Sequence, residues 1–358
     1  MHVQRIQLGE NHYSWLVLDD NYLPIKPIQE FIRYLEHTEK SPNTIRAYAN
    51  HLKLFWEFLT QENQEWTQIN IDHLSRFVFW LRSSNTKFGS LTHRSKRAET
   101  TVNCIITCLS SFYRYHKQLG HTEVEITQPS VYGHHRYKSF LHHVHKHKPL
   151  QKKVVKLAST KQLPKTLTES QLKAAFEACA NLRDKLLLRL LYETGLRIGQ
   201  ALGLQHQDIQ SWDNVIQIIP RERLVNGART KSRKPYVVHV SIQLMQLYTE
   251  YINQFMLKLP EHSHVFINLT SLEPLNYRAV RQLFIRLSNK IGFALTPHMF
   301  RHTHATELIR EGWDAAFVQK RLGHASVQTT LDIYSHLDTQ DLKNAYKTFL
   351  SNRRKENE

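Results

Sequence analysis

The sequence has no run of about 18 consecutive apolar residues, the length that a membrane-spanning helix requires. Its first ten residues, MHVQRIQLGE, show no signal-peptide pattern, and the chain carries no lipidation motif. These absences argue against an integral membrane protein, a lipid-anchored protein and a secreted protein. We therefore expect a soluble, intracellular protein.

Cysteine is scarce. The three cysteines are Cys104, Cys108 and Cys179, an odd number without the spacing of a metal site or a redox pair. Cys104 and Cys108 stand one helical turn apart within an apolar pattern, which predicts two buried thiols. A reducing cytoplasm is consistent with this usage.

Acidic residues are few relative to basic ones. The 358 residues include 31 Asp or Glu and 48 Lys or Arg, which gives a formal net charge of +17. Excess positive charge favours a polyanionic partner because each neutralised phosphate releases counterions. Nucleic acid is the first candidate, and an anionic membrane surface is the alternative, although the chain offers no amphipathic membrane anchor.

One segment has no acidic residue at all. Residues 130–165 hold nine Lys or Arg and six His, a bias that suggests a basic linker. It is either a solvated connector or a segment that follows DNA phosphates while two domains close around a duplex, and we favour the second. Its HHVHKHK cluster also suggests a metal site, but basic residues interrupt the cluster without clear ligand geometry, so we expect no metal.

The length and the 41% apolar content allow two domains with proper cores and exclude a mostly disordered chain. Alternation over Tyr13–Leu18 predicts a β-hairpin or arm within residues 1–25. Helical spacing of apolar residues then predicts a four-helix unit. Its helices are expected at about residues 28–35, 45–59, 71–81 and 102–115.

The second half mixes helices with a small sheet. Thr168 and Gln171 form a capping box for one helix, and Leu182–Tyr192 is a nearly all-apolar, buried helix. Val215–Ile219 and Pro235–Val240 read as strands, and Asn226-Gly227 between them is a hairpin signal. The predicted fold class is therefore mainly α with one small antiparallel sheet.

The C-terminal part carries the chemistry. Thr296-Pro297 and Gly312 bound a predicted helix in which His298 and Arg301 share a face near the N-terminus, where backbone N–H groups favour an anion such as phosphate. A second helix stops at Gly323, which leaves His324 on the following turn, and a third carries Tyr334.

His298-x-x-Arg301, Leu322-Gly323-His324 and Tyr334 together resemble the signature of the tyrosine recombinase (phage integrase) family. Upstream, TGLRIGQALGL resembles the family's first box, with Arg197 in the place of its first active-site arginine. SPNTIRAYANHLKLFWEFL and TTVNCIITCLSSFYRYH are similar to helices of its core-binding domain. The resemblance implies an N-terminal, four-helix, SAM-like core-binding domain and a mixed α/β catalytic domain.

The resemblance also implies catalytic roles. Tyr334 would attack phosphorus and form a 3′-phosphotyrosyl link. Arg197 and Arg301 would bind the non-bridging oxygens, with His324 as a third donor. His298 would accept the tyrosine proton. Neither a metal nor a cofactor is required.

The lysine that protonates the 5′-oxygen in the family lies in a β-turn before a strand like PYVVHV. Strand matching places it at Lys231, and the length of the preceding Pro220–Thr230 segment keeps Lys234 open. The chain departs from the family at Gln200, where an acidic residue is usual, so the support of Arg197 is expected to differ. His304, where the family often has an apolar residue, is expected to be incidental.

DNA contacts are expected from basic residues outside the catalytic set. The polar connection between the third and fourth helices should lie near the DNA backbone, and so should the basic linker. A terminal helix bearing Leu342 and Leu350 would dock either on its own domain or, as in the family, on the next protomer. The expected DNA-binding residues are Arg94, Lys96, Arg97, Lys146, Lys148, Lys152 and Lys153.

The resemblance thus implies a site-specific recombinase acting on double-stranded DNA in integration or transposition of a mobile element, as a synaptic tetramer with a dimer on each site. A type IB topoisomerase and a catalytically silent DNA-binding protein are the alternatives. The resemblance is to bacterial-type recombinases carried by transposons and phages, so we expect a cytoplasmic, nucleoid-associated protein. The predicted domains are an arm (1–25), a core-binding domain (26–122), a basic linker (123–165) and a catalytic domain (166–358).

Overall fold

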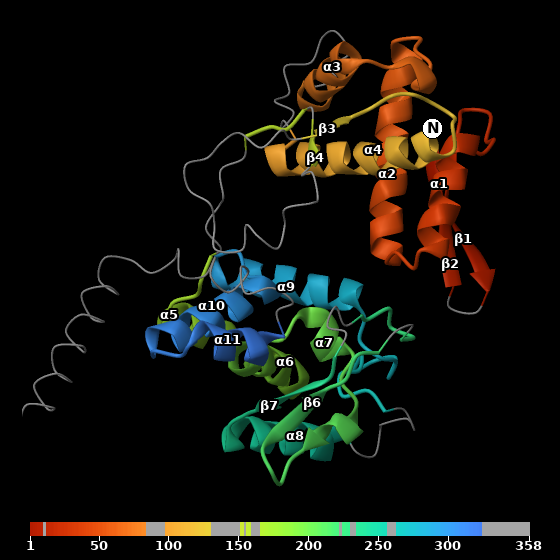
Figure 1. Ribbon diagram of the computed structural model, residues 1–358. Coiled ribbons are helices and arrows are strands. Elements are labelled where there is room, and N and C mark those ends of the chain that lie inside the picture. The colour runs from red at the N-terminus through yellow and green to blue at the C-terminus, as the bar shows by residue number, and fades with distance from the viewer. Residues whose placement is uncertain are drawn as a thin grey trace, which may run out of the picture. The chain divides into compact units, whose positions relative to one another are not determined.

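The computed structural model describes residues 1–9, 12–83, 97–129, 151–153, 155–158, 165–221, 224–229, 234–255 and 263–323 (Figure 1). The chain divides into two units, Met1–Lys161 and Gln162–Glu358. No helix within the described residues is long and apolar enough to cross a membrane.

The N-terminal unit contains the four predicted helices. Ser41 begins the second by accepting a hydrogen bond from the backbone N–H of Thr44, with Pro42 in the first turn. Asn70 and His73 begin the third through a reciprocal capping box. The helices are α1 (Lys26–His37), α2 (Pro42–Gln61), α3 (Ile71–Arg82) and α4 (Glu99–Gln118).

The core of this unit is aromatic. Phe31 of α1 packs edge-on against Phe112 of α4, with ring centroids 5.6 Å apart. Phe55 of α2 makes a similar contact with Phe77 of α3 at 5.1 Å. These side chains are at most 1% exposed, so the apolar stripes of the sequence do face one another and hold the four helices together.

The predicted hairpin precedes these helices. Strand β1 (His2–Gly9) pairs antiparallel with β2 (His12–Leu18), and Val17 of β2 is buried against the helical core. The pairing covers more of the chain than the alternation indicated, because β1 is mostly exposed and its side chains do not alternate between apolar and polar.

Part of the segment expected to be a linker belongs to the N-terminal unit. Strand β3 (Thr127–Pro129) pairs antiparallel with β4 (Gln151–Lys153). Val155 and Leu157 then pack on the core, and Asn103 of α4 bonds to both backbone groups of Leu157 at 2.9 Å. Apolar residues of this basic segment thus hold part of it against the core of the N-terminal unit. Its role beside DNA stays a prediction.

The cysteine prediction was half wrong. Cys108 is fully buried, but Cys104 is exposed. The buried face of α4 is centred near Ile105 and Leu109, and Cys104 lies about 100° around the helix from Ile105. A spacing of one turn was therefore not enough to place both thiols in the core.

The C-terminal unit is built around α6, which packs against both α8 and α10 (Figure 1). The Thr168–Gln171 capping box is present at the start of α5. The helices are α5 (Glu169–Glu177), α6 (Leu182–Thr194), α7 (Ile198–Leu202), α8 (Ile242–Phe255), α9 (Tyr277–Ile291), α10 (Pro297–Arg310) and α11 (Ala315–Leu322).

The predicted antiparallel sheet is present. Strand β6 (Val215–Ile218) pairs with β5 (Ile209–Gln210) on one side and β7 (Tyr236–His239) on the other. Asn226-Gly227 does form a turn, in which Gly227 N–H donates to the Leu224 carbonyl oxygen at 2.8 Å. The prediction was wrong only in making this turn a short hairpin, because residues 219–235 connect β6 to β7. Asn226 instead donates hydrogen bonds from Nδ2 to the carbonyl oxygens of Leu202 and Leu275, and so anchors this connection to the end of α7.

Candidate active site

Two arginines from distant parts of the chain meet at the ends of α6 and α11. Gly195 ends α6 in the left-handed conformation, and Arg197 follows it as the N-cap of α7. Arg301 of α10 donates from Nη1 to the Gly195 carbonyl oxygen at 2.6 Å and from Nη2 to that of Leu322 at 2.9 Å. Arg197 Nη1 lies 3.4 Å from the carbonyl oxygen of Gly323. The fold therefore brings both arginines to the turn that precedes His324.

The two guanidinium groups form a concentrated positive charge. Arg301 is 5% exposed. Burial first, and the charge of Arg197 second, lower the pKa of Arg301 to about 9, which leaves it protonated at neutral pH. Within the described part of the chain neither arginine forms an ion pair with a carboxylate, and their partners are backbone carbonyls. Such a pair of cations favours an incoming anion.

Gln200 supports this site in a way that the sequence did not reveal. Its Oε1 accepts the backbone N–H of Arg197 at 3.0 Å, and its Nε2 donates to the hydroxyl oxygen of Tyr236 at 2.9 Å. Gln200 is 2% exposed, so both bonds are sheltered from water. The neutral amide thereby fixes the backbone of Arg197 and the ring of Tyr236 together.

Tyr236 is a site residue that sequence reasoning missed. It begins β7, on the same face as the buried Val238, and its ring lies against Gly323. Burial raises the pKa of Tyr236 despite the nearby arginines, so its hydroxyl is neutral and remains able to donate a hydrogen bond. The signal available was strand alternation, which places Tyr236 and Val238 on one face.

Arg321 holds α11 in place and was also missed. Its Nη2 donates to the carbonyl oxygens of Glu193 and His239 at 2.9 and 3.1 Å, and its Nε donates to His304 Nε2 at 3.1 Å. Burial, followed by the charges of Arg321 and Arg301, lowers the pKa of His304 to about 3. The ring is therefore neutral and accepts the bond. His304 was expected to be incidental, but it is a buried partner of the helix that positions Leu322 and Gly323.

The close packing at Gly195 leads to a stability prediction. Its φ is +61°, and an added Cβ would lie 2.5 Å from Leu322 Cδ2 and 2.9 Å from His304 Cδ2. Gly195→Ala therefore combines backbone strain with overpacking and should lower the free energy of unfolding by about 2–4 kcal/mol in urea titrations followed by circular dichroism.

Gly292→Ala is the matched control for that variant. Gly292 also ends a helix with positive φ, +78°, but an added Cβ would meet nothing within 4 Å. The free energy of unfolding of Gly292→Ala should therefore fall by only about 1–2 kcal/mol. Equal losses in the two variants would show that α11 does not press on Gly195.

The structure describes some of the remaining predicted site residues but not others. His298 is exposed on α10, one turn before Arg301, with its ring centroid 6.4 Å from that of His302. Lys234 is exposed just before β7. Arg97 is half-buried and donates to the carbonyl oxygen of Leu81 at 3.2 Å, and Lys152 and Lys153 lie in β4. Outside the described residues are Lys231, His324, Tyr334, Arg94, Lys96, Lys146 and Lys148.

Comparisons with known proteins agree with this architecture. The model of the phage integrase family matches residues 165–341, and that of the phage integrase N-terminal SAM-like domain matches residues 28–120. Transposase A from transposon Tn554 of Staphylococcus aureus is 46% identical over 356 residues, covering 98% of each chain. Tyrosine recombinase XerA of Pyrococcus horikoshii is 28% identical and covers 89% of this chain and 91% of its own.

Solved structures show the same fold. The XerH site-specific recombinase, bound to its palindromic difH substrate in a post-cleavage complex, superposes with a TM-score of 0.60 at 20% identity, over 90% of this chain and 84% of that one. The family models together match well over half of the chain, and the match to transposase A is nearly end to end. The chain therefore belongs to the phage integrase family of tyrosine recombinases.

Proposed function

We propose that this protein is the recombinase of a transposon, which cuts and rejoins DNA strands at specific sites through a 3′-phosphotyrosyl intermediate on Tyr334. The observation that carries the proposal is the meeting of Arg197 and Arg301 at the turn before His324, without a carboxylate partner among the described residues. The 46% identity to a transposase over 98% of both chains supports the transposon as the element served.

The arginines keep enough donors to bind a phosphate. A guanidinium has five N–H donors. Arg301 commits one from each terminal nitrogen to a backbone carbonyl, and Arg197 commits one weakly. The remaining donors would bind the non-bridging oxygens as negative charge grows on them during attack. The carbonyl bonds hold both groups before DNA arrives, so little reorganisation is required.

The other roles complete a metal-independent transesterification. Tyr334 would displace the 5′-oxygen from phosphorus and keep the 3′-phosphate, which preserves the energy of the phosphodiester bond for rejoining. His298 would accept the proton of Tyr334, His324 would donate to the phosphate, and Lys231 or Lys234 would protonate the leaving oxygen.

Covalent capture tests this function. Nicked duplexes tiled across the ends of the element that encodes the protein should yield a denaturant-resistant protein–DNA adduct, because the fragment beyond the nick diffuses away and prevents rejoining. A chelator should leave the yield unchanged. Binding without an adduct on every duplex would point instead to a catalytically silent DNA-binding protein.

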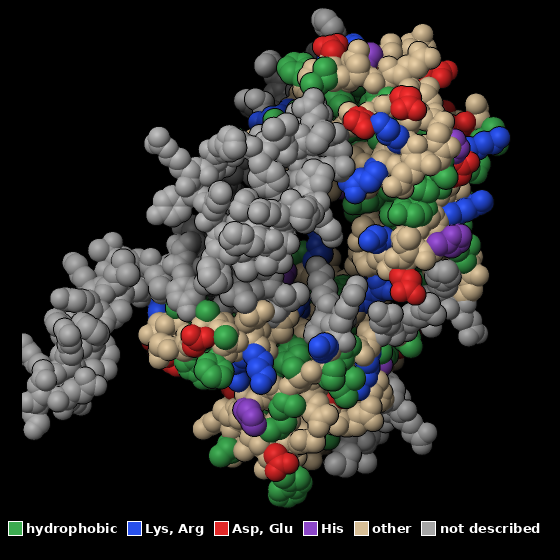
Figure 2. Space-filling view, in the orientation of Figure 1, with side chains coloured by type: hydrophobic (Ala, Val, Ile, Leu, Met, Phe, Trp, Pro, Cys, Tyr) green, Lys and Arg blue, Asp and Glu red, His purple; other side chains and the backbone are tan. Residues whose placement is uncertain are grey.

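The proposal also includes how DNA is held. The core-binding domain (26–122) and the catalytic domain (166–358) would bind one duplex between them, with the linker (123–165) along its phosphates. Lys and Arg side chains are visible on both units in Figure 2. A dimer on each site and a tetramer in synapsis would follow the family, and the bacterial relative supports action on the nucleoid in the cytoplasm.

The linker role has a quantitative test. Neutralising its lysines should weaken binding to all duplexes alike, because interactions with phosphates carry no sequence information. The slope of log K against log salt should become shallower by about 0.9 for each phosphate that the variant no longer neutralises, or by about 3–4 in total. The variant changes Lys146, Lys148, Lys152 and Lys153 to Gln.

A control variant loses the same number of positive charges outside the linker. It shows how much of the change in slope comes from the lower net charge alone and how much from lost contacts between the linker and phosphates. It changes four exposed lysines, two in each unit, and should leave most of the slope intact. A slope that falls equally in both variants would mean that the linker is only a solvated connector. The control residues are Lys26, Lys40, Lys173 and Lys185.

A further inference from the structure

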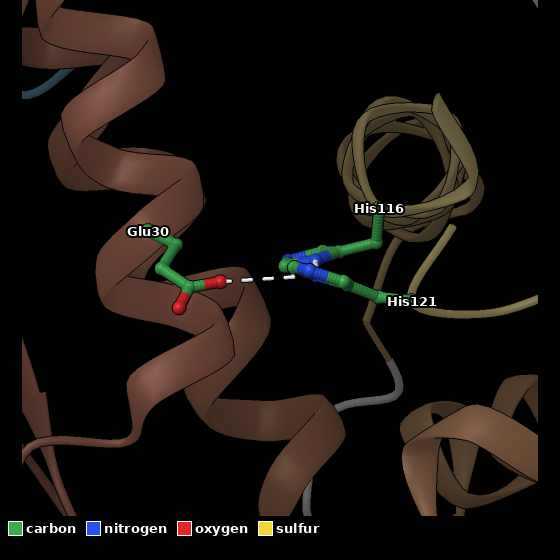
Figure 3. A group of neighbouring side chains, drawn as sticks. All are labelled: Glu30, His116 and His121. Atoms are coloured by element: carbon green, nitrogen blue, oxygen red, sulfur yellow. Dashed lines mark hydrogen bonds and ion pairs between the residues drawn. The ribbon is translucent and has the colours of Figure 1, made fainter. Parts of the chain in front are cut away.

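Three side chains with metal-binding atoms converge in the N-terminal unit, whereas the arginine site belongs to the C-terminal unit. Glu30 lies on α1, His116 near the end of α4, and His121 just after α4 (Figure 3). One ligand atom from each lies within 4.8 Å of the others. In Figure 3 the two imidazole rings lie close together and the Glu30 carboxylate points toward them.

The surroundings of His116 fix its orientation and its tautomer. The residue is fully buried, with Trp66 and Phe112 at ring-centroid distances of 4.8 and 4.5 Å. Its Nε2 lies 3.0 Å from the carbonyl oxygen of Pro27. A carbonyl only accepts, so Nε2 carries the hydrogen and, in the neutral ring, Nδ1 holds a free lone pair.

This arrangement is the one usual for a histidine that binds a metal. Such a histidine generally donates its second N–H to a backbone carbonyl or carboxylate, which sets the ring and leaves the other nitrogen for the ion. Here Pro27 supplies the carbonyl. Nδ1 of His116 then points at Nδ1 of His121, 3.0 Å away.

The distances suit one small ion. Two nitrogens bound to tetrahedral zinc, each at about 2.0–2.1 Å, are about 3.3 Å apart, close to the 3.0 Å between the two Nδ1 atoms. Glu30 Oε2 lies 3.9 Å from His121 Nδ1. The side chains of Glu30 and His121 are 47% and 44% exposed, so both can make the small adjustment that a shared ion needs.

We propose that Glu30, His116 and His121 form a structural site for one zinc-type transition-metal ion, with water as the fourth ligand, that fastens α1 to the end of α4. Without the ion, His121 Nδ1–H donates to His116 Nδ1. When the ion binds, that proton moves to Nε2 of His121, so both Nδ1 lone pairs reach the metal and no electron is transferred. Two imidazoles and one carboxylate suit zinc, cobalt or nickel rather than magnesium or calcium.

The exposed ligands provide the test, because replacing the buried His116 would disturb the core. Full-length wild type, His121→Asn, Glu30→Gln and the control His37→Asn are titrated with zinc chloride against a chromophoric chelator. His37 is exposed at the end of the same helix as Glu30. All variants keep the six histidines of residues 130–165, so binding there contributes equally to each titration.

Wild type and His37→Asn should each bind one zinc ion with the same affinity. His121→Asn should bind that ion at least about 100-fold more weakly, because losing even a residue that only hydrogen-bonds to a metal ligand lowers metal affinity by about 10–100-fold. The zinc affinity of Glu30→Gln should lie between those of wild type and His121→Asn. Zinc at about 100 times Kd should raise the Tm of the N-terminal unit by about 5–10 °C in wild type and in His37→Asn but not in His121→Asn, and magnesium should not raise it in any of them.

Tryptophan fluorescence reports this unit, because four of the six tryptophans lie in it and Trp66 touches His116. Equal zinc affinity and equal Tm shifts in wild type and His121→Asn would overturn the site. So would a magnesium response equal to the zinc response.

Discussion

Tyr334→Phe should retain full DNA binding yet form no covalent adduct on a nicked duplex, a loss of at least about 10⁴-fold in cleavage. Only the phenolic oxygen can attack phosphorus, while the aromatic ring that contributes to binding is kept. The measurement is the fraction of labelled DNA that remains attached to protein after denaturation, alongside a binding titration under the same salt.

Tyr346→Phe is the matched control, since Tyr346 belongs to the same terminal segment but stands outside the family signature. It should form the adduct at the wild-type rate. An adduct that persists in Tyr334→Phe and disappears in Tyr346→Phe would transfer the nucleophile to Tyr346.

Lys231→Ala should slow cleavage by about 10²–10⁴-fold, the usual contribution of a general acid. A substrate with sulfur in place of the 5′-bridging oxygen should restore most of that rate, because the thiolate leaves without a proton. Cleavage of both substrates is compared in single-turnover reactions. Lys234→Ala, two positions before β7, should show little defect on either substrate.

Arg301→Ala provides the contrast. Its defect lies in stabilising charge on the non-bridging oxygens, so the sulfur substrate should not rescue it. Rescue of Lys234→Ala with no defect in Lys231→Ala would assign the acid to Lys234. Rescue of neither lysine variant would leave His324 as the proton donor.

Much of the fold was predictable because it depends on local patterns. The apolar stripes of α1 to α4, the capping box at Thr168 and the glycine that ends α11 each act within a few residues. The antiparallel sheet followed from β-branched runs. The two-residue strand β5 carries too little pattern to be seen, and the Asn226 turn was misassigned because its partners, Leu202 and Leu275, lie far along the chain.

The candidate site was predictable only in part. The family spacing pointed to Arg197 and Arg301, but no local pattern could show that Arg301 donates to the carbonyl oxygens of Gly195 and Leu322 while Arg197 approaches that of Gly323. The roles of Tyr236 and Arg321 depend on contacts across 36 and 128 positions. Such residues look ordinary in the sequence, since their importance comes from the tertiary packing alone.

The two bonds from Arg301 to backbone carbonyl oxygens determine when, during folding, the candidate site is assembled. Those bonds require that α6, α10 and α11 have all reached their final positions, because each contributes either the side chain or an accepting carbonyl. A chain still emerging from the ribosome, or one partly unfolded, lacks at least one of these elements, and Arg301 then cannot make both bonds. Any DNA cleavage that depends on this pair of arginines can therefore begin only after the C-terminal unit has folded.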